Sequence, residues 1–203
     1  MFPSFPGKVQ HIQVDGGDLL YIPDFLQPEE SISVMENLRQ EIAWKQETIS
    51  LFGKQYLTPR LTAWYGDPGA AYSYSGLKLQ PEAWTKTLLL LKQKAEIAAG
   101  CSFNSVLLNW YRQGADSMGW HADDEKELGK NPVIGSISLG AKRTMRFRRK
   151  DNHRTTFKTE LSNGSLLIMQ GEIQHYWQHA IPKSLAVKED RINLTFRKIF
   201  LPD

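Results

Sequence analysis

A histidine and an aspartate, His121 and Asp123, lie two positions apart in the second half of the sequence. Residues at positions i and i+2 of an extended chain point to the same side, so both can bind one metal ion. A third ligand can come from His175 or His179, much later in the chain. Two histidines and one carboxylate leave coordination positions open, as in non-haem Fe(II) oxygenases. Such a triplet also occurs by chance, and a surface loop over residues 119–130 is the alternative.

The last predicted strand alternates between polar and apolar residues. Its polar face carries Arg191, Asn193, Thr195 and Arg197, and its apolar face carries Ile192, Leu194 and Phe196. We expect the apolar face in the core. Interior arginines are costly unless anions pair with them, and a small dicarboxylate beside the metal would satisfy both. Asn109 and Tyr111 share a face of another strand and can hydrogen-bond the same ligand. The pattern also fits a strand whose polar face meets solvent.

Two helices and several short strands are expected to position these residues. Residues 1–22 read as a loop that ends in a strand at 19–22. A helix is predicted from Pro28, where proline and acidic residues suit a first turn. Its apolar stripe is Ile32, Met35, Leu38 and Ile42. A second helix is predicted from about Pro81 to Gly100.

Beyond residue 100 the apolar residues alternate in short segments separated by turn signals, which favours a β sandwich or barrel. These segments are 106–111, 133–139, 145–147, 165–169 and 191–199. We therefore expect one domain over residues 1–203. Helices and loops would occupy about residues 1–100, and a β core about 101–203.

Composition excludes several classes of protein. The chain has 203 residues, of which 41% are hydrophobic and 23% charged, unlike collagen, a long coiled coil or a disordered chain. Its longest aliphatic run, residues 88–91, is far shorter than the roughly 20 apolar residues of a membrane span, and no secretory signal is visible. The single cysteine, Cys101, excludes an intramolecular disulfide and favours a reducing, intracellular compartment.

Five short segments stand out together by their order and spacing. They are Asn109-Trp110-Tyr111, His121-Ala122-Asp123-Asp124-Glu125, Ser136-Ile137-Ser138-Leu139-Gly140, His179-Ala180-Ile181-Pro182 and Arg191-Ile192-Asn193-Leu194-Thr195-Phe196-Arg197. With them the sequence resembles the AlkB family of iron- and 2-oxoglutarate-dependent nucleic-acid dealkylases, over roughly residues 52–199. The resemblance implies an α+β, mainly β fold. Its core would be a double-stranded β-helix, or jelly roll, with N-terminal helices and a nucleotide-recognition lid.

The resemblance also implies a role for each matched residue. The iron ligands would be His121, Asp123 and His179. A match to His-x-x-Pro favours His179 over His175. Arg191 would hold one carboxylate of 2-oxoglutarate and Arg197 the other. Further hydrogen bonds to this cosubstrate are expected from Asn109, Tyr111, Asn193 and Thr195. Only the resemblance names Fe(II), 2-oxoglutarate and O2.

Residues near the pocket mouth are expected to hold a base that is flipped out of its stack. Within a lid at residues 65–77, Tyr74 would stack on the base and Tyr72 would contact a base or phosphate. Ordinary packing under the lid is the alternative for Tyr72. Asp124 and Glu125 follow the ligand Asp123, and Asp124 would accept a hydrogen bond from an exocyclic amine or orient the lid. A solvated loop carboxylate is the alternative for Asp124.

A predicted hairpin at residues 47–57 carries an apolar tip, Phe52-Gly53, which resembles the finger loop of duplex-DNA repair members. Such a tip can wedge into a duplex and fill the space that a flipped base vacates. Lys54 and Arg60 would meet phosphates. Six basic and no acidic residues over positions 142–150 would form a further ridge for the nucleic-acid backbone.

The leading hypothesis is oxidative DNA repair. The protein would remove methyl groups from N1-methyladenine and N3-methylcytosine in duplex DNA, with release of formaldehyde. The alternatives are an RNA or single-stranded DNA demethylase, a catalytically silent nucleic-acid-binding module, and a protein or small-molecule hydroxylase. Alkylated DNA, or RNA, is the expected partner of a monomer without membrane contact. The expected location is the cytoplasm of a bacterium or the nucleus of a eukaryote.

Overall fold

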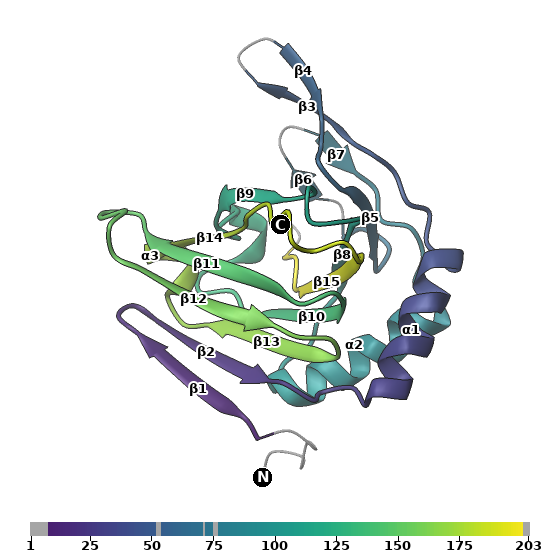
Figure 1. Cartoon of the computed structure of the whole chain (residues 1–203), viewed down its shortest axis with the longest axis horizontal. Coiled ribbons are helices and arrows are strands. Elements are labelled where there is room, and N and C mark those ends of the chain that lie inside the picture. Colours follow the sequence, from purple (N-terminus) through teal and green to yellow (C-terminus); the bar gives the residue numbers. More distant parts are fainter. Residues whose placement is uncertain (1–7, 52–53, 71, 75–76, 201–203) are drawn as a thin grey trace.

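A computed structural model describes residues 8–51, 54–70, 72–74 and 77–200 of the chain (Figure 1). The side chains of residues 49–54 and 71–79 lie outside this description. Two antiparallel sheets form the centre of the molecule, and two helices lie together beside the larger sheet. The α+β, mainly β class and the jelly-roll core are confirmed.

The larger sheet has seven strands in the order β1-β2-β13-β10-β15-β8-β5. Their bounds are β1 Gln10–Val14, β2 Gly17–Ile22, β13 Ser165–Gln170, β10 Ile134–Gly140, β15 Arg191–Arg197, β8 Ser105–Tyr111 and β5 Leu61–Gly66. The smaller sheet has the order β12-β11-β14-β9. Its strands are β12 Thr156–Leu161, β11 Arg143–Arg149, β14 Trp177–Ile181 and β9 Met118–His121. Two hairpins stand apart, β3 Thr48–Leu51 with β4 Lys54–Leu57, and β6 Tyr72–Tyr74 with β7 Leu77–Leu79.

The helices cover the outer face of the larger sheet. They are α1 Pro28–Glu41 and α2 Lys86–Ala99, whereas α3 Ile173–Tyr176 and a 3-10 turn at Lys126–Leu128 are short connections. The apolar residues of β15, namely Ile192, Leu194 and Phe196, pack with both helices in one cluster. The polar residues of β15 therefore face the space between the two sheets. A second cluster joins the inner faces of the sheets through residues such as Leu107, Phe147 and Trp177.

Several details correct the sequence-based expectations. The predicted N-terminal loop contains strand β1, which pairs with β2. Ile32 is 67% exposed, because α1 buries Ser31, Val34 and Met35 in its place. The second helix begins at Lys86, where the Thr85 side chain accepts a hydrogen bond from the Leu88 amide. Gly100 ends it as predicted, with a φ of 67°.

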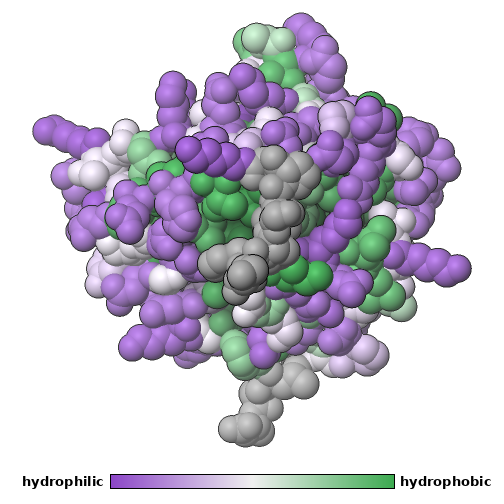
Figure 2. Space-filling view, turned by 90° about the horizontal axis from the view of Figure 1, so that it is seen from below, coloured by the Kyte–Doolittle hydropathy of each residue, from purple (hydrophilic) through white to green (hydrophobic). Residues whose placement is uncertain are grey.

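No helix in the described ranges is long and apolar enough to span a membrane. Figure 2, which views the molecule from below, shows hydrophilic side chains around the rim of this face and hydrophobic ones near its centre.

Candidate active site

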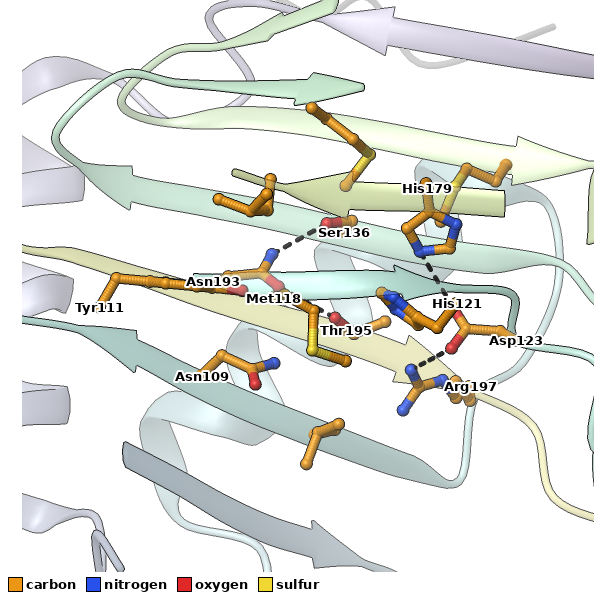
Figure 3. Close-up of a pocket in the computed structure, with 14 residues that line it drawn as sticks. Asn109, Tyr111, Met118, His121, Asp123, Ser136, His179, Asn193, Thr195 and Arg197 are labelled. Atoms are coloured by element: carbon orange, nitrogen blue, oxygen red, sulfur yellow. Dashed lines mark hydrogen bonds and ion pairs between the residues drawn. The ribbon is translucent and has the colours of Figure 1, made fainter. Parts of the chain in front are cut away.

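A pocket lies between the two sheets, and side chains from both sheets line it (Figure 3). The larger sheet contributes Leu107, Asn109, Tyr111, Ser136, Met169, Asn193, Thr195 and Arg197. The smaller sheet and the loop after β9 contribute Met118, His121, Asp123, Met145, His179 and Ile181. In Figure 3 the two histidines, Asp123 and Arg197 gather at one end. Tyr111, Asn109 and Ser136 lie toward the other.

A β-bulge directs the histidine of β9 into this pocket. His121 pairs with His179 of β14, but Met118 pairs with Ile181, so three steps along β9 match two along β14. Residues 118 and 121 both face inward as a result. The ring centroids of His121 and His179 are 4.2 Å apart. His175, the other candidate, is near Asn131, with its Nε2 2.7 Å from Oδ1, and does not line the pocket.

The electrostatics at this end favour metal-binding forms of the side chains. Burial lowers the pKa of His179 to about 3, helped by the neighbouring His121, so the imidazole is neutral. Burial opposes the charge on Asp123, but Arg197 and the two histidines outweigh it and lower the pKa of the carboxyl. His121 Nδ1 lies 2.9 Å from the Gly119 carbonyl oxygen and donates to it, which leaves Nε2 with the lone pair that a metal needs.

Asp123 divides its oxygens between two neighbours. Oδ1 accepts a hydrogen bond from Arg197 Nη2, whereas Oδ2 is buried without a hydrogen-bond partner among the described residues and lies 4.0 Å from His179 Nε2. Two donor atoms of one ion, each at about 2.1 Å, lie within about 4.2 Å of each other. Nevertheless, in the described part of the chain no three His, Cys, Asp or Glu side chains form a closed metal site as they stand. The donor types and the unbonded Asp123 Oδ2 fit a metal ion. The side chains of His121, Asp123 and His179 must move closer together to bind it.

The buried guanidinium of Arg191 is a second feature that fits an anion. The side chain is 1% exposed, and its Nη2 donates to Ser138 Oγ at 2.9 Å. Its Nε and Nη1 have no hydrogen-bond partner among the described residues. Its guanidinium lies 5.2 Å from the centroid of the Tyr111 ring. Burial lowers the pKa of Arg191 to about 10, so it stays charged at neutral pH. A carboxylate fits these free donors.

The remaining residues expected around 2-oxoglutarate are partly engaged with one another. Asn193 Nδ2 donates to Ser136 Oγ and to the Ile137 carbonyl, each at 2.9 Å. Thr195 Oγ1 donates to Asn193 Oδ1 at 3.1 Å. Asn109 Oδ1 accepts from Arg60 Nε at 2.7 Å, which leaves the Asn109 amide NH2 for a ligand.

Arg60 therefore differs from expectation. It is 5% exposed and faces Asn109 inside the protein, so in this structure it does not present a guanidinium to a phosphate. Nothing in its sequence neighbourhood distinguishes a buried arginine from a surface one. The contact depends on the pairing of β5 with β8, which places Thr62 opposite Asn109.

Of the other predicted substrate residues, Asp124 and Glu125 follow the pocket residue Asp123 in the chain, and the rest lie wholly or in part outside the described residues. Phe52 and Gly53 lie outside the described residues, as do the side chains of Lys54, Tyr72 and Tyr74. Strands β3 and β4 pair over residues 48–57, which confirms the hairpin expected at residues 47–57. Asp124 Oδ2 accepts a hydrogen bond from Lys150 Nζ at 2.6 Å. Glu125 precedes the 3-10 turn and buries Oε2 without a hydrogen-bond partner in the described ranges.

The basic segment at 142–150 divides between interior and surface. Arg143 is 3% exposed and donates to the carbonyls of Asp116 and Pro182, so it is structural. Arg149 pairs with Asp15 and Asp151. Arg146 stays exposed. The expected ridge is thus smaller than the count of basic residues indicates.

One supporting residue carried no sequence signal. Gln174 of α3 is 1% exposed, and its Oε1 accepts a hydrogen bond from the Asp123 amide at 2.9 Å. Lys150 Nζ donates to the Gln174 carbonyl at 2.8 Å as well as to Asp124. These bonds hold the loop after β9 against α3, and the position of Asp123 depends on them.

Comparisons with known proteins show the family of the chain. A family model for the 2OG-Fe(II) oxygenase superfamily matches residues 18–197. The alpha-ketoglutarate-dependent dioxygenase alkB homolog 3 of Bos taurus is 44% identical over 89% of this chain and 65% of its own length. The DNA oxidative demethylase ALKBH2 of Homo sapiens is 36% identical over 95% of this chain and 77% of its own length. The chain belongs to the AlkB family of 2OG-Fe(II) oxygenases.

This AlkB-family chain spans about two thirds of the length of the first curated relatives it matches, at 65% for the bovine one. A solved structure, "The structure of OsALKBH1", superposes with a TM-score of 0.67 over 93% of this chain and all of that chain, at 16% identity. That likeness supports the fold alone. The superfamily is named for Fe(II) and 2-oxoglutarate, which fits the histidine and carboxylate donors and the buried arginines described above.

Proposed function

We propose that this protein is an oxidative dealkylase of nucleic acid that removes methyl groups from N1-methyladenine and N3-methylcytosine in DNA, duplex DNA included. Within the family, the pocket carries the proposal. A neutral His179 and an Asp123 oxygen that accepts no hydrogen bond from the described residues line one buried pocket. The free donors of Arg191 lie beside Tyr111, which lines the same pocket. The names of two relatives, a DNA oxidative demethylase and an alkB homolog dioxygenase, support the substrate class.

In this proposal the iron ligands are His121, Asp123 and His179. When bound, Fe(II) and 2-oxoglutarate supply the oxidation of the N-methyl carbon by O2. Arg197 holds Asp123 in place and keeps its carboxylate charged, while Arg191 and the Asn109 amide bind the cosubstrate. The sheets on both sides exclude water from the reacting groups. The oxidised methyl group leaves as formaldehyde, so the protein itself provides no nucleophile.

The reaction is tested on an oligonucleotide that holds one N3-methylcytosine, as single strand and as duplex. We expect the modified strand to lose the mass of one methylene group only when Fe(II) and 2-oxoglutarate are both present. A matched N1-methyladenine strand tests the second lesion. Iron binding and succinate formation without any mass loss would contradict a nucleic-acid substrate. The absence of both iron and succinate would instead favour the silent binding module.

Duplex activity is tested at the hairpin of β3 and β4. In Phe52→Ala, we expect activity on the duplex to fall by about 10-fold and activity on the single strand by less than about 3-fold, because only a duplex needs an apolar wedge. Equal losses on both substrates would contradict the wedge and favour a single-stranded DNA or RNA demethylase.

A further inference from the structure

The bulge that turns His121 into the pocket turns the preceding residue outward. Met118 and His121 both line the inner pocket, whereas Trp120 lies on the opposite, outer face of the smaller sheet. A large aromatic side chain on a solvent-facing strand is normally covered by a neighbour. Trp120 remains 37% exposed. The tryptophan therefore lies at the surface, one residue from a proposed iron ligand.

Trp120 forms one wall of a groove on this outer face. The groove has a volume of about 390 Å3 and is also lined by Arg146, Phe147, Thr156, Phe157 and Lys158, of which Phe147 is fully buried and belongs to the inner cluster. The pairing of β11 explains their arrangement, because Arg146 lies opposite Lys158 on one side and Ala180 on the other.

The groove carries two exposed cations, although Glu160 of β12, outside the groove lining, interacts with Lys158. Arg146 and Lys158 are exposed, and neither forms an ion pair within the described residues. No acidic side chain from the described part of the chain lines the groove. By contrast, Lys142 and Arg149, from the same basic segment, both pair with acidic residues. The groove is therefore complementary to a chain of negative charges.

The tryptophan is held in a fixed orientation. The Arg148 guanidinium carbon lies 4.4 Å from the centroid of the Trp120 ring, and Arg148 Nε donates to Gln178 Oε1 at 2.9 Å. An arginine so placed stacks on the indole and limits its motion. A rigid aromatic platform next to exposed cations is how proteins bind single-stranded nucleic acid, with bases on the rings and phosphates at the cations.

We propose that this groove binds the single-stranded segment next to the modified nucleotide, with one base stacked on Trp120 and phosphates at Arg146 and Lys158. The proposal rests on the proposed function and adds a surface to it. Bases within an intact duplex are already stacked on each other and cannot reach the indole. The groove should therefore contribute more to the binding of single strands than of duplexes.

The test measures the affinity of the iron-free protein for a fluorescein-labelled, unmodified 15-mer of thymidylate by fluorescence anisotropy. This probe carries no lesion, so binding reports the groove and not the pocket. We expect Trp120→Ala to weaken binding by about 10-fold, within the range for loss of one stacked base. Trp120→Phe, which keeps a ring, should weaken it by less than about 3-fold.

Salt dependence separates stacking from charge. The slope of log affinity against log salt should become shallower by about 0.7 in Arg146→Ala and again in Lys158→Ala, as for one phosphate contact each. Trp120→Ala should leave the slope unchanged.

A matched control is Tyr176→Ala. Tyr176 is 41% exposed with Arg149 at 5.4 Å from its ring, but it lies outside the groove. Wild-type affinity in Trp120→Ala, or an equal loss in Tyr176→Ala, would overturn the proposal. An equal loss of affinity for a 15-base-pair duplex would also overturn it. If an acidic peptide displaced the 15-mer equally well from wild type and Trp120→Ala, the groove would be a simple cation patch and the stacking proposal would fail.

The experiments distinguish an error in the groove proposal from an error in the proposed function. Demethylation by the wild type, together with Trp120-independent binding, overturns only the groove. Trp120-dependent binding without demethylation of either lesion overturns the proposed reaction and leaves the groove in place. Unchanged Fe(II) affinity in Trp120→Ala shows that the neighbouring His121 has not moved.

Discussion

The two faces of the smaller sheet differ in how their side chains are held, although the same four strands form both. On the inner face, His179 is 4% exposed, and the adjacent Asp123 is fixed by Arg197 and Gln174. On the outer face, Arg146 and Lys158 contact solvent and lack ion pairs among the described residues. Alternation along a strand thus places the buried, mutually bonded pocket side chains on one face and the exposed cations on the other.

This difference predicts that substitutions on the two faces impair different properties of the protein. Inner side chains are bonded to one another, so removing one should disturb catalysis, cosubstrate binding or stability. Outer side chains have few internal partners, so removing one should change substrate affinity alone. The predictions below test this separation.

The largest effect is expected from His121→Ala. If His121 is one of three protein ligands, its loss should lower the turnover of 2-oxoglutarate to succinate by at least about 100-fold, since even indirect support of a metal ligand is worth roughly 10- to 100-fold. The control is His175→Ala, because His175 contacts Asn131 away from the pocket and its loss should leave turnover unchanged. Activity in His121→Ala within about 10-fold of wild type would contradict the metal assignment.

The next effect concerns the two kinds of arginine. Arg191→Met removes buried donors to a carboxylate, so we expect the KM for 2-oxoglutarate to rise by about 10- to 100-fold, as for loss of a charged hydrogen-bonded pair. Arg146→Met, on the outer face, should leave this KM unchanged and weaken only nucleic-acid binding. A similar rise in both variants would mean that the cosubstrate is not held inside the pocket.

The inner face should also make stability depend on pH. The pKa of His179 is lowered to about 3 in the folded protein, against about 6.5 in the unfolded chain. Between these values the unfolded chain binds the proton more readily, so the metal-free protein loses stability as pH falls below about 6.5. The free energy of unfolding should drop by up to about 1.4 kcal/mol per pH unit.

Denaturant titrations at about pH 6 and about pH 4, on either side of the steepest range, measure this dependence. The slope should flatten in His179→Gln, which cannot take up a proton. It should persist in His153→Gln, where the histidine lies on an exposed turn. Undiminished pH dependence in His179→Gln would show that another group causes it.

The sequence predicted the inner face well because its signals are local and repeated. The alternation over β15 placed Ile192 in the core and Arg191 toward the pocket, and its seven residues are all buried, which excludes a solvent-facing polar side. Gly100 ended α2 because it adopts a positive φ that other residues avoid. In each case neighbouring residues alone determine the outcome.

Features that depend on pairing between distant strands were not predictable. The bulge in β9, which separates His121 from Trp120, arises from its register with β14. Arg60 was expected at the surface, but the pairing of β5 with β8 brings it to Asn109. Gln174 lies in a short helix, and its side chain meets the Asp123 amide from a distant part of the chain. None of these contacts leaves a pattern in the residues around it.

The smallest effect, and the sharpest test of the boundary between the faces, is expected from Lys150→Ala. Lys150 bonds Asp124 and the carbonyl of Gln174, whose side chain accepts from the Asp123 amide, so it joins an exposed carboxylate to the support of a proposed ligand. Its side chain is 31% exposed and that of Asp124 46%, and such ion pairs contribute about 0–1 kcal/mol. We therefore expect Fe(II) affinity to fall by less than about 5-fold. Gln174→Ala, which removes the buried bond to the Asp123 amide, should lower it by about 10-fold or more. A larger loss of Fe(II) affinity in Lys150→Ala than in Gln174→Ala would show that the surface contact of Lys150 holds the loop that carries Asp123. In that case, substitutions on the outer face would also affect the metal ligands, and the two faces would not be separate at Asp123.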